Sequence, residues 1–143
     1  VSVTAWNTQK FDAYNWFVTV QYASGAIGHL DLTVAVRMDW HEGFQIYGEH
    51  GSILGKTYNP WLFKSSDVEV FSARDGCYHR PLGEDAHFFK LQVEGFADTI
   101  LDQAPMKGAN LEDGVAAMRA MAAIARSVES KETVRLADVT GGV

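Results

Sequence analysis

The spacing of the apolar residues changes near Pro81, and this change constrains the fold more than any other feature of the sequence. Before Pro81, apolar and polar residues alternate in short runs, as they do in half-buried strands. After it, Phe89, Val93, Phe96 and Ile100 recur at the spacing of one helix face. Strands followed by helices are typical of an α+β domain. We therefore expect an α+β fold with an open, mainly antiparallel sheet and helices packed on one face.

The strand half begins with a predicted hairpin. Segments 14–22 and 26–36 are rich in β-branched and aromatic residues, and a turn at Ala23-Ser24-Gly25 separates them. In segment 26–36 the alternation gives two faces of different character. The apolar face, expected to lie on the core, consists of Leu30, Leu32, Val34 and Val36. The other, semi-polar face carries His29, Asp31 and Thr33.

A second hairpin is predicted at 44–54, where Glu49-His50 lies between Gly48 and Gly51. Further strands are expected at 67–72, near Cys77 and at 133–136. Of the two expected helices, the first starts at Asp85 as N-cap and ends before Pro105. The second starts at Asn110, with Asp113 three residues on in a capping-box arrangement. Its expected buried stripe is Leu111, Val115, Met118, Ala122 and Ala125.

Composition excludes several classes of function. The 143 residues fit one domain, and a net charge of −6 with interspersed signs argues against nucleic-acid binding. We find no apolar run long enough for a membrane span, so no membrane partner is expected. Cys77 is the single cysteine, which precludes an internal disulfide and favours the cytoplasm. Because the chain starts at Val1 and not at methionine, we expect it to be a piece of a longer protein.

Groups able to perform chemistry are few. The histidines are scattered without metal-ligand spacing, so no metal site is expected. The chain has no G-x-G-x-x-G turn, P-loop or G-x-S-x-G elbow, so we expect neither a bound cofactor nor a serine nucleophile. His29 and Asp31 share a strand face about 7 Å apart. They suit the rim of an interface better than an acid/base pair in a small lyase or isomerase, and both alternatives stay open.

Segment 37–42 is the best candidate for ligand contact. It ends a long strand and combines the cation Arg37 and Met38 with the aromatic Trp40 and the imidazole of His41. Loops of this kind bind hydroxylated or anionic small molecules. The alternative is an ordinary strand-end loop with Trp40 folded back on the core. Tyr58 and Trp61 allow the same two interpretations.

An ordered set of motifs resembles a known family. The set comprises Ser24-Gly25-Ala26 between two strands, the I-Y-G-x-x-G hairpin at 46–51, the helix from Phe89 to Phe96 and the helix start at Asp113-Gly114. Over essentially all 143 residues the chain resembles the C-terminal domain of the glucose–fructose oxidoreductase, inositol dehydrogenase and MocA (Gfo/Idh/MocA) family. The resemblance implies an NAD(P)-dependent oxidoreductase of sugars, inositols or related polyols. It places the catalytic lysine and histidine motifs, and the Rossmann domain that binds NAD or NADP, outside this chain.

The resemblance also assigns roles within the chain. Residues 1–143 would form a single substrate-binding and oligomerisation domain without catalytic residues, inactive in isolation. The substrate contacts implied by position, together with those expected from segment 37–42, are Arg37, Met38, Trp40, His41, His87 and Phe89. The sheet face with His29, Asp31 and Thr33 would pack against another subunit of a homo-oligomer. The alternative is a stand-alone ligand-binding or protein-interaction module without catalysis.

Overall fold

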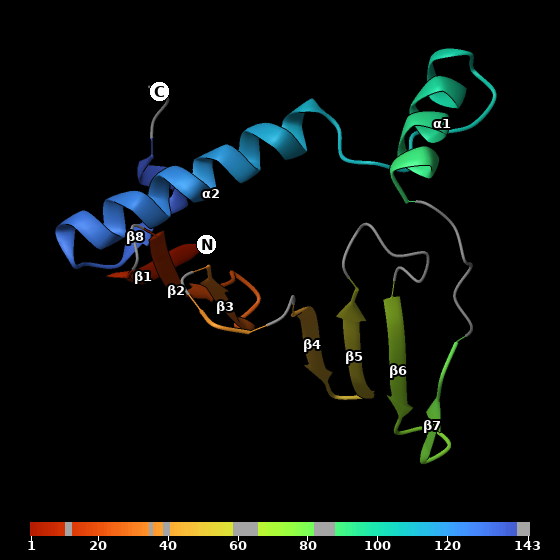
Figure 1. Ribbon diagram of the computed structural model, residues 1–143, viewed down its shortest axis with the longest axis horizontal. Helices are drawn as coiled ribbons and strands as arrows, with labels where there is room; N and C mark the ends of the chain where they lie inside the picture. Colours follow the sequence, from red (N-terminus) through yellow and green to blue (C-terminus); the bar gives the residue numbers. More distant parts are fainter. Residues whose placement is uncertain (11–12, 35, 39–40, 59–65, 82–87, 140–143) are drawn as a thin grey trace. The chain divides into compact units, whose positions relative to one another are not determined.

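The computed structural model (Figure 1) describes residues 1–10, 13–34, 36–38, 41–58, 66–81 and 88–139. Within these ranges the chain forms eight strands, two α-helices and one short 3-10 helix. It divides into two compact units. The first consists of Val1–Arg37 and Ala109–Val143, and the second of Met38–Gly108.

The first unit contains a four-stranded antiparallel sheet, here called sheet A. Its strands are β1 (Ser2–Lys10), β2 (Ala13–Gln21), β3 (Ile27–Thr33) and β8 (Val134–Arg135). They lie in the order β3-β2-β1-β8, so β3 and β8 are the two edges. The predicted turn at 23–25 joins β2 to β3, with Gly25 at a φ of 90° that favours glycine. The 3-10 helix η1 (Leu136–Asp138) follows β8.

Helix α2 (Leu111–Ser130) covers one face of sheet A (Figure 1). The core of the unit lies between the two, and it consists of Val3, Ala5, Val18, Ala123 and Val134. The buried helix residue Ala123 is small, which lets the helix backbone approach β1 closely. The helix begins as predicted, because the Asn110 side chain accepts from the Asp113 N–H and the Asp113 carboxylate accepts from the Asn110 N–H.

The second unit contains sheet B, also antiparallel. Its strands are β4 (Glu42–Gly48), β5 (Gly51–Thr57), β6 (Ser66–Ser72) and β7 (Cys77–His79), in sequence order across the sheet. The second predicted hairpin is confirmed as β4 and β5, which turn at Glu49-His50. Helix α1 (Phe88–Ile100) belongs to the same unit and carries the helical spacing expected after Pro81. Its predicted cap, Asp85, lies outside the described residues.

The α+β class with antiparallel strands is confirmed, and the structure adds that the strands form two sheets of four. Two expectations about burial are wrong. Leu30 and Leu32 share the helix-covered face with Val18 but stay 52 % and 53 % exposed, because β3 is an edge strand. In α2 the predicted stripe is exposed at Leu111, Val115 and Met118, and the buried positions are Ala123 and Ser127. No helix in the described part of the chain is long and apolar enough to cross a membrane.

Candidate functional site

The face of sheet A opposite α2 is open and carries both polar and apolar side chains. Strand register defines it, because residues paired across neighbouring strands share one face. Thr4 pairs with Thr19, which pairs with His29, and Trp6 belongs to the next row with Asp31. This surface, called the open face below, includes Thr4, Trp6, Thr19, His29, Asp31 and Thr33. The three residues expected to form a subunit interface therefore lie on one surface, and their role there stays a prediction.

Three of these side chains form a hydrogen-bonded chain. His29 Nε2 lies 2.8 Å from Asp31 Oδ1, and His29 Nδ1 lies 3.4 Å from Thr19 Oγ1. With the proton on Nε2, the imidazole donates to the carboxylate and accepts from the threonine hydroxyl. The His29 and Asp31 side chains are 57 % and 55 % exposed. A general acid or base works best where water is excluded, so this exposed position favours a contact surface over an acid/base pair.

Sequence reasoning missed Thr19 as the third member of this chain. Thr19 is ten residues before His29, and only the register of the hairpin brings the two together. The signal was present in the sequence, since the turn at 23–25 fixes which residue of β2 faces His29.

The predicted substrate residues are described only in part. Trp40 and His87 lie outside the described residues. Arg37 and Met38 occupy an exposed bend after β3, and His41 directly precedes β4 and is exposed. Phe89 lies in the first turn of α1 and is 44 % exposed. Arg37 belongs to the first unit and the others to the second, so their convergence on one substrate stays a prediction.

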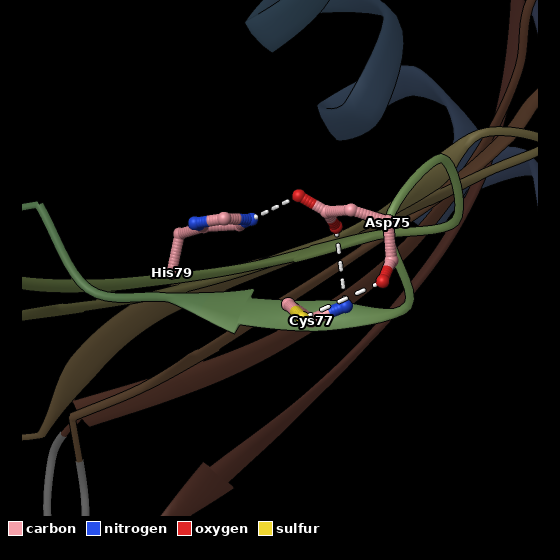
Figure 2. Close-up of polar contacts among 3 residues, drawn as sticks. All are labelled: Asp75, Cys77 and His79. Atoms are coloured by element: carbon pink, nitrogen blue, oxygen red, sulfur yellow. Dashed lines mark hydrogen bonds and ion pairs between the residues drawn. The ribbon is translucent and has the colours of Figure 1, made fainter.

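A second polar network closes the turn between β6 and β7 (Figure 2). The Asp75 carboxylate accepts the backbone N–H of Cys77 at 3.1 Å and contacts His79 Nε2 at 2.9 Å. The Cys77 thiol donates to the Asp75 carbonyl oxygen at 3.4 Å. Gly76 provides the positive φ of 67° that the turn requires. Cys77 and His79 are two residues apart in the sequence, but no sequence pattern indicates Asp75, whose role depends on the turn.

This network stabilises the turn. The carboxylate oxygens are used by a backbone amide and an imidazole, and Cys77 is exposed at the surface. Among the described residues, no three His, Cys, Asp or Glu side chains are arranged to hold a metal ion. The hydrogen bond from Cys77, supported by His79, holds the pKa of Asp75 below its ordinary value of 3.8.

The lowered pKa of Asp75 predicts a pH-dependent contribution to stability. Because the folded pKa lies below the ordinary value, the contribution is present above pH 3.8 and is lost as pH falls through the folded pKa. We expect Asp75→Ala to lower the melting temperature at neutral pH, and the difference from the unsubstituted chain to shrink as the pH falls below 3.8. Thermal melts at several pH values measure this. Glu49→Ala, at the turn between β4 and β5, is the control and should show no such trend. An effect of Asp75→Ala that does not change with pH would contradict the prediction.

Sheet B also has a shallow hollow on one face. Glu69, Tyr78 and Arg80 line it. The Glu69 carboxylate accepts a hydrogen bond from Arg80 Nε at 2.7 Å and forms an ion pair with Arg80 Nη2 at 2.6 Å. Because the two charges neutralise each other, the hollow does not offer a free cation to an anionic ligand.

Two kinds of comparison relate the chain to known proteins, and a third finds nothing. The family model described as "Oxidoreductase family, C-terminal alpha/beta domain", the Gfo/Idh/MocA family, matches residues 1–136. No curated protein matches the chain.

Solved structures share the fold. A protein from Desulfitobacterium hafniense, described as an NADPH-dependent oxidoreductase, matches 98 % of this chain and 43 % of its own, with 15 % identity and a TM-score of 0.79. The aldose–aldose oxidoreductase of Caulobacter crescentus, crystallised with glycerol, matches over 94 % and 41 %, with 16 % identity and a TM-score of 0.76. A protein of Bacillus subtilis described as an oxidoreductase matches over 93 % and 45 %, with 15 % identity and a TM-score of 0.64.

The chain therefore spans less than half the length of these solved proteins. At these identities the structural likeness establishes the fold alone. The family model covers nearly the whole chain, and it supplies the assignment that structural likeness does not. The chain belongs to the Gfo/Idh/MocA oxidoreductase family and corresponds to its C-terminal alpha/beta domain.

Proposed function

We propose that this chain provides the substrate contacts and the subunit interface of an NAD(P)-dependent oxidoreductase that acts on a sugar, an inositol or a related polyol. The observation that carries the proposal is the match of the family's C-terminal domain model to residues 1–136. Two of the solved structures with this fold are described as an NADPH-dependent oxidoreductase and an aldose–aldose oxidoreductase, which supports the cofactor and the substrate class.

The proposed division of labour follows from the chemistry of hydride transfer. The nicotinamide accepts or donates the hydride, and a Rossmann domain outside residues 1–143 would hold it. This chain would hold the substrate so that its reacting carbon faces the cofactor, which accounts for much of the rate enhancement in a bimolecular step. We assign the substrate contacts to the segment from Arg37 to His41 and to the start of α1 at Phe89, with Trp40 and His87 as the predicted members outside the described residues.

The open face is the proposed subunit interface. It carries hydroxyl groups, an imidazole and the 56 % exposed Trp6, a mixture suited to a contact with another protein surface. We expect the 143-residue chain to be at least a dimer at tens of micromolar in sedimentation experiments. A monomer at that concentration would contradict the interface and leave the family assignment untouched.

The catalytic part of the proposal predicts that the chain alone does not turn over substrate. We expect no reduction of NAD or NADP with a panel of aldoses, inositols and linear polyols, because the groups that hold the nicotinamide and move the proton lie outside this chain. Turnover by the chain alone would contradict the proposal.

The natural protein provides a second, independent test. Peptide mapping in the source cell should find sequence upstream of Val1, roughly 150 residues or more and enough for another domain, with a glycine-rich dinucleotide fingerprint. A natural chain that begins near Val1 would favour the alternative of a stand-alone binding or interaction module.

A further inference from the structure

Asp31 and Arg135 lie at opposite edges of the open face. Asp31 is on the edge strand β3 and shares a row with Trp6 through the pairing of β1, β2 and β3. Arg135 is on the other edge strand, β8, and pairs with Ser2. Ser2 and Trp6 are four residues apart on β1 and therefore point to the same side. The two charges are separated by about 14 Å across the strands and about 13 Å along them, too far to pair within one copy.

Neither charge has a permanent counter-ion in the part of the chain that the structure describes. The Asp31 carboxylate contacts His29, which is charged only when protonated. The Arg135 guanidinium makes no hydrogen bond or ion pair with a described residue. It lies at an open hollow with the uncharged side chains of Ser2, Gln21 and Thr133. The open face thus presents one anionic and one cationic edge.

This charge pattern is complementary to itself. In a two-fold dimer each contact occurs twice, with residue i against j and j against i. Consider a two-fold axis that lies in the plane of the interface. It passes through the midpoint of the line from Asp31 to Arg135, at right angles to that line. Rotation about this axis places the Asp31 edge of one copy against the Arg135 edge of the other. Two Asp31 carboxylates then meet two guanidinium groups, while the strand rows with Trp6 and Thr19 meet in the middle.

We propose that a second copy of this chain packs on the open face, with Asp31 of each copy paired with Arg135 of the other. The inference rests on the subunit interface proposed above and adds the contact that sets its register. Exposed residues at an interface rim affect association and specificity more than folding, so both side chains can be changed without loss of the fold.

Charge reversal tests the pair. The dimer Kd of the 143-residue chain is measured by analytical ultracentrifugation at low salt, where charge pairs are least screened. We expect Asp31→Arg and Arg135→Asp each to weaken the dimer about tenfold or more, because each places like charges opposite each other twice. The double variant, with both charges exchanged, should return to within about threefold of the natural chain.

Matched controls carry the same changes of charge on α2, which lies on the other face of sheet A. Arg119→Asp and Glu129→Arg are both at exposed positions and should leave the Kd unchanged. Circular dichroism melts confirm that each variant is folded. If the unsubstituted 143-residue chain is monomeric, the proposed interface itself is wrong. A natural dimer whose single reversals behave like the controls, or a double variant no tighter than the singles, would overturn the Asp31–Arg135 pair alone.

Discussion

Gly51→Ala is expected to destabilise sheet B by about 3 kcal/mol or more, because the substitution combines backbone strain with overpacking. Gly51 begins β5 with a φ of 151°, a conformation that L side chains rarely adopt. A Cβ at this position would overlap the backbone carbonyl oxygen of Phe71 in the neighbouring strand β6. Neither backbone can move without disturbing the ladder between β5 and β6, in which Gly51 pairs with Ser72.

Gly48→Ala is the matched control, because Gly48 pairs with Gly51 across the same turn. A Cβ on Gly48 would meet its nearest neighbour, the Gly51 carbonyl oxygen, at 3.7 Å, an ordinary van der Waals distance. Urea denaturation gives the free energy of unfolding for both variants, and hydrogen exchange at the amides of β5 and β6 gives the local effect. Equal losses in the two variants would show that the close approach to Phe71 is not a constraint.

The features that the sequence predicted correctly are those that local residues determine. The glycines around Glu49-His50 require a hairpin, and Asn110 with Asp113 requires a helix start at Leu111. Both depend on a few neighbouring residues, so no knowledge of the rest of the fold was needed. The period change near Pro81 is equally local and separates the strands of sheet B from α1.

The sequence did not reveal which side of an amphipathic element meets the core. In α2 the large residues Leu111 and Met118 suggested the buried stripe, but the helix packs on β1 through Ala123 and Ser127. Close packing of a helix on a strand favours small side chains, and a hydrophobic pattern gives such residues little weight. Edge positions cause a similar error, since Leu30 has the pattern of a core residue and lies on the edge strand β3.

The same distinction between local and long-range information applies to the candidate site. Strand alternation sufficed to place His29 and Asp31 on one face. The contact of His29 with Thr19 depends on the register of the β2–β3 hairpin, whereas the position of Arg135 at the far edge of that face follows from the order β3-β2-β1-β8. Strand order joins residues more than a hundred positions apart, which no local pattern specifies.

Ser127 has the second large effect that we expect. This buried serine connects α2, β1 and the turn before β8. Its hydroxyl accepts the Ala5 N–H at 3.0 Å and donates to the Glu132 carbonyl oxygen at 2.6 Å. The pairing of β1 with β8 covers only Ser2 and Val3, so the serine satisfies a β1 amide beyond the end of the ladder.

Ser127→Ala removes both hydrogen bonds and leaves the Ala5 N–H and the Glu132 carbonyl without this partner. We expect the free energy of unfolding to fall by about 2 kcal/mol. Ser130→Ala is the control: it lies on the same helix, is exposed, and loses one 3.3 Å bond from the Glu132 N–H. Both substitutions replace a serine of α2 with alanine, so the difference between their unfolding free energies compares the buried hydroxyl with an exposed one. If the unfolding free energies of the two variants differ by less than about 0.5 kcal/mol, the Ser127 hydroxyl does not hold β1 to the helix.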